Sequence, residues 1–376
     1  MPLCASLHTH NLQFNFEART SRGPMKNRPV WFLKLWNESN PETFGLGECA
    51  PLIGLSKETN EEVEQNLFEL VSNINSTSIE LPSKPFGSLL ELTEYLKINS
   101  ILPSQSSLVF AIETALLDLA NGGKRLIFAT QFISGEPISI NGLIWMGGLD
   151  YLLQQIDIKI RDGFTCIKIK VGGHDFEKEC DILQYIRRKY YKQNIVVRVD
   201  ANGAFKVDDA LYKLNILAKF NIHSIEQPIK PGLEEMAMLC RESPVPIALD
   251  EELIGIPSEK KESLLATLKP QHIILKPSLM GGVNSCDEWI QLADRLKIGW
   301  WATSALESNI GLNAIAQFCS QYPLSIPHGL GTGLLYTNNF DSPLRVNKGQ
   351  LNYNQLTEWD LTQLFPPHEP IQSEIN

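Results

Sequence analysis

The chain reads CIKIKVGG at residues 166–173, a short β-rich run that ends in a pair of glycines. Successive side chains of a β-strand point to opposite faces. Lys168 and Lys170 therefore share one face, and the isoleucines at 167 and 169 share the other. Burying an ammonium group is costly unless it pairs with an opposite charge. The run predicts a strand with an apolar outer face and a charged face that points into an enclosed site.

The same pattern continues along the chain. The run IVVRVD ends at Asp200, with Arg198 on the same face, and later β-rich runs end at Glu226, Asp250 and Lys276. The intervals from Asp200 to Lys276 are 26, 24 and 26 residues, about one strand–helix unit each. In a barrel of such units the carboxyl ends of the strands meet at one mouth, which carries the chemistry. We expect the charged strand ends to gather there.

Eight β-rich runs alternate with helical stretches, which predicts parallel βα units closed into a barrel. The runs are Ile138–Ile144, Cys166–Val171, Ile195–Asp200, Ser224–Glu226, Ile247–Asp250, Ile273–Lys276, Ile298–Thr303 and Leu324–Pro327.

The region before the barrel has a different, α+β character. The strands expected there are Leu12–Phe16 and Val30–Trp36, joined by a loop at Thr20–Pro24, and the helices are Glu61–Val71, Leu89–Leu96 and Ser107–Ala120. The last of these is apolar nearly all round, which predicts a buried helix. After about Ser342 the βα rhythm stops. We therefore predict a capping domain at 1–135, a barrel at 136–342, and a segment at 343–376 that returns to the capping domain.

Composition excludes several classes of protein. The chain has 376 residues, 43% of them apolar, with a net charge of -10 and a pI near 5.3. An acidic surface argues against nucleic-acid and anionic-membrane partners, and no apolar run reaches the roughly 18 residues of a spanning helix. Its seven cysteines are scattered, and the N-terminus does not resemble a signal peptide, so we expect reduced thiols and a cytoplasmic location. The sequence leaves a homo-oligomer open.

The charged strand ends include three carboxylates, those of Asp200, Glu226 and Asp250. A cluster with oxygen ligands alone suits Mg²⁺, with Mn²⁺ as an acceptable substitute. Lys170 and Lys276 are expected to face each other across the metal. The metal and the neighbouring lysine should favour the neutral amine of Lys170, which could then act as a base.

The charges of the expected interior do not cancel. Four positive charges come from Lys168, Lys170, Lys276 and Arg198. Mg²⁺ adds two and the three carboxylates subtract three, so the net charge is +3. A positive interior in an acidic protein predicts an anionic substrate, here a small dicarboxylate. Removal of a proton next to a carboxylate would give an enediolate, which such an interior stabilises.

The motifs KIKVGG, VDANGAF, EQP, LDEEL and KPSLMGG resemble the muconate-lactonising subgroup of the enolase superfamily. The resemblance covers nearly the whole chain. It implies a modified TIM barrel of the (β/α)7β type with an α+β capping domain. It further implies that Lys170 and Lys276 are the acid/base groups and that Asp200, Glu226 and Asp250 are the metal ligands.

Motifs farther from the charged strand ends resemble the o-succinylbenzoate synthase family. They are GLGECAPLIGLS (45–56), the preceding TSRGPMKNR, TSALESNIGL (303–312) and PHGLGTGLLY (327–336). The implied reaction is syn elimination of water from 2-succinyl-6-hydroxy-2,4-cyclohexadiene-1-carboxylate, a step of menaquinone synthesis. A glycine-rich turn at the eighth strand suits a carboxylate. The expected substrate-binding residues are Lys168, Ser304, Glu307, Gly329, Gly331 and Thr332.

Three alternatives remain open from sequence. An N-acylamino-acid or dipeptide racemase, or a muconate cycloisomerase, could use the same scaffold, although the eighth strand lacks the Asp-x-Asp pair typical of dipeptide epimerases. A Schiff-base aldolase could use Lys276 as its nucleophile, but this leaves three converging carboxylates unexplained. A barrel kept only for binding would be free to lose a charged residue, and none is missing here.

Overall fold

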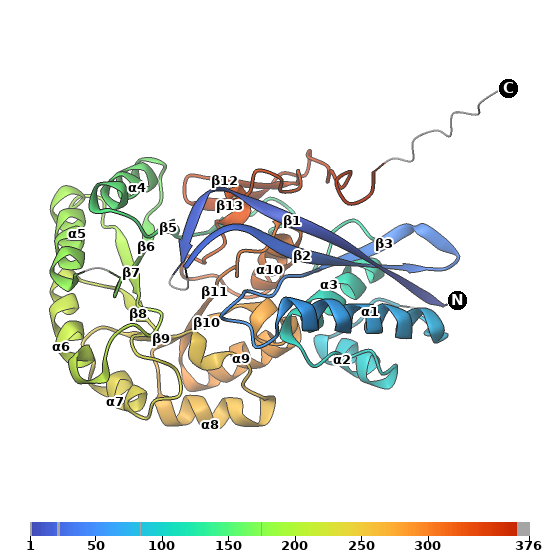
Figure 1. Cartoon of the computed structure of the whole chain (residues 1–376), viewed down its shortest axis with the longest axis horizontal. Helices are drawn as coiled ribbons and strands as arrows, with labels where there is room; N and C mark the ends of the chain where they lie inside the picture. The colour runs from blue at the N-terminus through green and yellow to red at the C-terminus, as the bar shows by residue number, and fades with distance from the viewer. Residues whose placement is uncertain (1, 21–22, 83, 174, 367–376) are drawn as a thin grey trace.

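The structure is a computed structural model, and it describes residues 2–20, 23–82, 84–173 and 175–366. A curled parallel sheet surrounded by helices forms one part of the molecule, and a long antiparallel sheet with three helices forms the other (Figure 1). No helix in the described ranges is long and apolar enough to cross a membrane.

The N-terminal sheet consists of β1 (Leu3–Thr20), β2 (Gly23–Asn37) and β3 (Asn40–Cys49), all antiparallel. Of the predicted loop at Thr20–Pro24, the described residues belong to strands instead, because Thr20 pairs with Gly23 and Arg19 with Pro24; Ser21 and Arg22 lie outside the described residues. The sequence interpretation also missed β3. Its glycines at 45 and 47 weaken the strand pattern, and a Cβ atom there would lie 1.9 and 1.8 Å from carbonyl oxygens of the helix beneath.

That helix is α3 (Ser106–Ala120), and α1 (Asn60–Ser76) and α2 (Leu89–Ile98) flank it. All three helices were predicted, and α3 is buried over most of its length, as its apolar composition indicated. The N-terminus of α1 is fixed by a capping box, in which Thr59 and Glu62 each satisfy the other's backbone amide.

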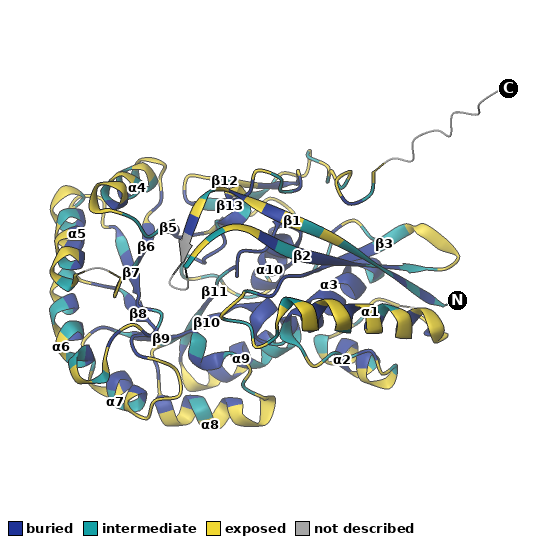
Figure 2. Cartoon of the chain, in the orientation of Figure 1, coloured by how far each residue is buried: buried dark blue, intermediate teal, exposed yellow. Residues whose placement is uncertain are grey.

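The barrel sheet has the strand order β11-β10-β9-β8-β7-β6-β5, and neighbouring strands in it are parallel. The strands are β5 (Gly142–Ile144), β6 (Cys166–Lys170), β7 (Val196–Asp200), β8 (Ser224–Glu226), β9 (Ile247–Leu249), β10 (His272–Leu275) and β11 (Gly299–Ala302). The helices that follow them are α4 (Leu149–Arg161), α5 (Phe176–Lys189), α6 (Val207–Leu217), α7 (Glu235–Glu242), α8 (Ser258–Leu268), α9 (Gly282–Leu296) and α10 (Asn309–Cys319). Figure 2 shows the outer faces of these helices exposed around buried strands.

Closure of the barrel differs in detail from the prediction. The expected eighth strand at Leu324–Pro327 is wrong, since the sheet is closed by single bridges of His328 to Ile140 and of Gly329 to Thr303. The expected first strand is divided, because β4 (Ile138–Ser139) pairs with the C-terminal hairpin before β5 enters the barrel. Seven strand–helix units and a short eighth crossing confirm the predicted barrel type.

The C-terminal region folds back over both parts. Its strands β12 (Leu344–Asn347) and β13 (Gln350–Tyr353) form a sheet with β4. Beyond them, Leu364 packs in an apolar cluster with Leu12, Phe14 and Phe32 of the N-terminal sheet. The domain limits at 135 and 342 stay a prediction.

Candidate active site

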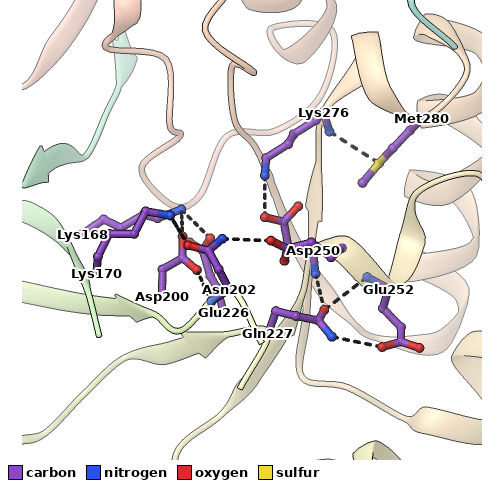
Figure 3. A network of polar contacts seen from close by, with 11 residues as sticks. Lys168, Lys170, Asp200, Asn202, Glu226, Gln227, Asp250, Glu252, Lys276 and Met280 are labelled. Atoms are coloured by element: carbon purple, nitrogen blue, oxygen red, sulfur yellow. Dashed lines mark hydrogen bonds and ion pairs between the residues drawn. The ribbon is translucent and has the colours of Figure 1, made fainter. Parts of the chain in front are cut away.

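The charged residues predicted at the strand ends lie together (Figure 3). Lys170, Asp200 and Glu226 are direct neighbours across β6, β7 and β8. Asp250 and Lys276 come immediately after β9 and β10. These charged side chains, which the two-residue period of a strand predicted to face inward, therefore lie at one end of the sheet.

Each lysine of the cluster contacts a carboxylate. Lys168 donates to Glu226 Oε2 and lies 3.0 Å from Asp200 Oδ2. The ammonium group of Lys170 is 2.7 Å from the same Asp200 oxygen, and that of Lys276 is 2.5 Å from Asp250 Oδ2. Asp200, Glu226 and Asp250 are almost completely buried, whereas the Lys170 side chain keeps 21% of its surface exposed.

Burial and ion pairing act against each other on these groups. Burial opposes the charge of Lys168, but the facing Asp200 and Glu226 raise its pKa above the usual value. The pKa of Lys276 is raised in the same way by Asp250, against the effect of burial. Burial raises the pKa of Glu226 to about 7, although Lys168 opposes this shift. Lys168 and Lys276 are therefore protonated in this arrangement.

The positions of the three carboxylates decide whether they can bind a metal together. Across the described ranges, no three or more His, Cys, Asp or Glu side chains converge closely enough to hold a metal ion. Lys168 Nζ contacts both Asp200 and Glu226, and Lys276 Nζ contacts Asp250 (Figure 3). However, Glu226 Oε1 and Asp250 Oδ1 are buried and accept no hydrogen bond. Buried carboxylate oxygens without donors are ordinarily compensated, so the donor set fits a hard cation such as Mg²⁺.

Sequence reasoning missed two amides that hold this cluster in place. The side-chain oxygen of Asn202 accepts from Lys170, and its Nδ2 donates to Glu251 at 2.9 Å. Gln227 accepts from the backbone amide of Asp250 at 3.3 Å and donates to Glu252 at 3.0 Å. Both have a positive φ, 43° and 37°, within two residues of a strand end. Their place in the DAN and EQP motifs could have revealed them.

A cavity of about 760 Å³ adjoins the cluster. Five of the residues predicted to bind substrate line it, namely Lys168, Ser304, Gly329, Gly331 and Thr332. Lys168 is the member of the charged cluster that reaches it. Phe16, Trp145, Leu306 and Leu335 supply apolar surface. A cavity that combines apolar walls with a few polar groups is typical of a small-molecule site.

Glu307 is placed differently from the other predicted substrate-binding residues. It does not line the cavity and is fully buried. Its two carboxylate oxygens accept from the hydroxyls of Ser278 and Ser304, each at 2.5 Å. Because Ser278 follows Lys276 by two residues, Glu307 ties the end of β11 to the segment that carries this lysine.

Comparison with known proteins agrees with the fold. A family model described as Enolase C-terminal domain-like matches residues 152–356, which include all the charged strand ends. The chain belongs to this family, within the enolase superfamily.

Individual relatives show which enzymes of this family the chain resembles. The chain is 42% identical over 365 residues to the o-succinylbenzoate synthase of Desulfotalea psychrophila, covering 92% of this chain and 98% of the relative. It is 26% identical over 297 residues to the o-succinylbenzoate synthase of Escherichia coli, covering 77% and 79%. Both resemblances seen in the sequence are thereby confirmed.

Solved structures give the same result. The crystal structure of MenC from Desulfotalea psychrophila has a TM-score of 0.84 at 39% identity and covers 94% of this chain and 100% of that one. The dipeptide epimerase of Cytophaga hutchinsonii, solved in complex with Mg and D-Ala-L-Val, has a TM-score of 0.78 at 20% identity and covers 96% and 98%. The second likeness concerns the fold alone.

Proposed function

We propose that the chain is an o-succinylbenzoate synthase, a carbon–oxygen lyase that removes water from 2-succinyl-6-hydroxy-2,4-cyclohexadiene-1-carboxylate with the help of Mg²⁺. The observation that carries the proposal is the placement of Lys170 and Lys276 on either side of a buried carboxylate cluster. Identity of 42% to a synthase over 98% of its length supports the same activity. The free cysteines and the anionic substrate suit a cytoplasmic step of menaquinone synthesis.

Lys170 is the proposed base. As the neutral amine it takes the proton from the ring carbon that bears the carboxylate, and the electron pair of that C–H bond moves into the carboxylate. The electrons then return to form the new ring double bond as the C–O bond to the hydroxyl breaks. Lys170 gives its proton to the departing oxygen, so that water leaves and the ring becomes aromatic. One group serves for both transfers because the elimination is syn.

Lys276 is the proposed electrostatic partner. It extends from the end of β10 to Asp250, whereas Lys168 and Lys170 extend from β6 toward Asp200 and Glu226 (Figure 3). Because Asp250 raises its pKa against the effect of burial, it stays protonated and can hold negative charge on the substrate carboxylate while the proton is away. It is paired with Asp250 here, so a substrate carboxylate would compete with Asp250 for its ammonium group.

The proposed Mg²⁺ ligands are Asp200, Glu226 and Asp250. When bound, the metal would supply Lewis-acid stabilisation of the substrate carboxylate. The residues must rearrange to receive it, because Lys168 and Lys276 now pair with the oxygens in question. Glu226 Oε1 and Asp250 Oδ1 already lack donors, and they support this assignment.

The test is proton NMR in D₂O with Mg²⁺, offering the cyclohexadiene substrate and an N-succinylamino acid in parallel. The proposed function predicts loss of the ring proton signals of the substrate and growth of aromatic product signals. A chain that only exchanges the α-proton of the amino acid, without dehydrating the other substrate, would be a racemase instead. Lys170→Arg is the matched control, since it keeps the charge without an accessible base.

A further inference from the structure

Arg28 is a buried guanidinium that takes no part in the proposed chemistry. It lies in β2, 2% exposed, with its charge among backbone carbonyl oxygens. Nη1 donates to the carbonyls of Ala305 and Leu306, each at 2.5 Å. Nη2 donates to the carbonyls of Ala50 and Pro51, the latter at 3.2 Å. One side chain of the N-terminal sheet thus connects the loop after β3 to the loop after β11.

Leu306 is held in an uncommon backbone conformation. Its φ is +69°, in the left-handed region that non-glycine residues rarely adopt. Its carbonyl accepts from Arg28 and also from the Tyr336 hydroxyl at 2.6 Å, while its amide donates to Ser304 Oγ at 3.1 Å. A strained residue persists only where its surroundings fix it, and such residues cluster at functional sites.

The side chain of Leu306 forms part of the cavity wall. It lines the cavity together with Leu335 and the polar residues Ser304 and Thr332. Nearby, the ring of Phe16 from the β1–β2 hairpin packs 5.1 Å from Trp145 of the barrel. The hairpin that carries Arg28 therefore lies against the barrel end in this region (Figure 1).

We propose that Arg28 is a positioning residue that sets the apolar wall of the substrate cavity through Leu306. It fixes the Leu306 carbonyl and thereby orients that side chain toward the apolar part of the bound substrate. The identity of that substrate rests on the proposed function; the contact from Arg28 to Leu306 does not. Because Arg28 acts on the wall and does not touch the reacting atoms, its loss affects substrate binding more than the chemical step.

The first readout needs no substrate. Hydrogen exchange measured by mass spectrometry is compared for the full-length protein, Arg28→Lys and Arg28→Met. We expect faster exchange, by about tenfold or more, in peptides covering 303–308 and 50–56, with no change in peptides covering 195–226. Arg187→Lys is the matched control, because Arg187 also donates to three carbonyls, each at 2.6 Å, but does not line the cavity. Unchanged exchange at 303–308 in both Arg28 variants would overturn the proposal.

The second readout is steady-state dehydration. We expect Arg28→Lys to raise KM about tenfold while kcat changes less than about threefold, as for lost binding without lost chemistry. Leu306→Gly removes the wall without backbone strain and should raise KM similarly. If Arg28 acts through Leu306, the double variant should be no worse than either single one, whereas independent effects would multiply. Multiplying effects count against the proposal. A wild-type protein without dehydratase activity would refute the proposed function, and hydrogen exchange would still decide the role of Arg28.

Discussion

Two groups of buried carboxylates lie in this molecule, and their surroundings differ. Asp200, Glu226 and Asp250 at the barrel mouth contact lysine ammonium groups, and two of their oxygens accept no hydrogen bond. A second group, Glu48, Glu113 and Asp118, lies between the N-terminal sheet and the barrel helices, where backbone amides are the main donors.

The second group serves helix ends and turns. Glu48 accepts from the amides of Ser308 and Gly311, at 2.9 and 2.8 Å, at the start of α10. Glu113 accepts from the amide of Val283 at 2.6 Å, at the start of α9. The first helical amides have no partner within the helix, and the positive end of the helix dipole favours a carboxylate there. These carboxylates replace missing backbone hydrogen bonds.

The comparison teaches how a structural carboxylate can be told from a functional one. Both kinds are buried and both have shifted pKa values. The structural ones accept mainly from backbone amides, with the Ser308 hydroxyl on Glu48 and the Arg125 guanidinium on Asp118 as further donors. The others face side chains that can move away, and they keep unused oxygens. Spare capacity in a buried acidic group, more than its burial, marks the site that binds something.

The sharpest test replaces the carboxyl group by an amide in one member of each group. Asp250→Asn should lower the dehydration rate by roughly 1,000-fold or more, because a proposed Mg²⁺ ligand is lost and with it the stabilisation of the developing charge. Glu113→Gln makes the same chemical change in the other group and should stay within about threefold of the wild type. Turnover with excess Mg²⁺ measures both, and circular dichroism confirms the fold. Comparable losses in the two variants would erase the distinction between the groups.

Metal removal addresses the same group without mutation. EDTA should abolish turnover, and Mg²⁺ or Mn²⁺ should restore it, because the oxygen donors suit hard cations. Full activity after exhaustive chelation would contradict the metal assignment.

The next substitutions should distinguish the role of Lys170 from that of Lys276. Lys170→Arg keeps the charge but removes the base, so dehydration should fall by about 100-fold to 10,000-fold. Lys276→Arg keeps the positive charge, which is what this position mainly supplies. It should therefore retain a measurable rate, with a loss of about 100-fold from altered geometry. Single-turnover rates measure both. A Lys170→Arg protein that dehydrates near the wild-type rate would mean that the base is misassigned.

A smaller effect is expected on stability. Glu113→Met leaves the amide of Val283 buried without an acceptor, which should cost about 1–3 kcal/mol in free energy of unfolding. The value of kcat/KM should not change, because Glu113 does not line the cavity. Urea unfolding and steady-state kinetics measure the two quantities. Unchanged stability would show that the carboxylate does not support α9.

The smallest effect is a pH dependence. Burial raises the pKa of Glu113 from 4.5 to about 8, and that of Glu48 from 4.5 to about 7. The folded form therefore holds protons that the unfolded form has released between about pH 4.5 and 8, so these groups contribute stability at low pH that is lost as the pH rises. Each contributes a slope of at most about 1.4 kcal/mol per pH unit. In Glu113→Gln, urea unfolding between pH 6 and 8 should follow a shallower slope than in the wild type. An identical slope would contradict the raised pKa.

Much of the fold could be predicted because strand period and helix periodicity are local. The inward set from Lys168 to Lys276 follows from side-chain alternation and from the spacing of one strand–helix unit. β3 could not be found in this way, because Gly45 and Gly47 are required by a tertiary contact. At these positions α3 approaches too closely for a Cβ atom. The end of the barrel was also misplaced, since His328 and Gly329 join the sheet through single bridges that tertiary contacts alone define.

The charged residues of the site could be predicted from the sequence, but the residues that hold the surrounding loops in place could not. Lys170 and Asp200 stand out in sequence because charged strand ends recur there on five consecutive predicted strands. Glu307 was expected to bind substrate, yet its position beneath Ser278 and Ser304 depends on how two loops meet. Arg28 was hidden for the same reason, because its partners are carbonyl oxygens, which every residue possesses.

The apolar cluster shared by the two ends of the chain has a consequence for synthesis on the ribosome. Leu12, Phe14 and Phe32 are made roughly 300 residues before their neighbours Tyr336 and Leu364. Domains usually begin to fold while the chain is still being made, from the N-terminal side. Here the residues of the N-terminal sheet must wait for Tyr336 and Leu364 before this cluster is complete. A chaperone that shields the sheet during this interval would protect its apolar residues.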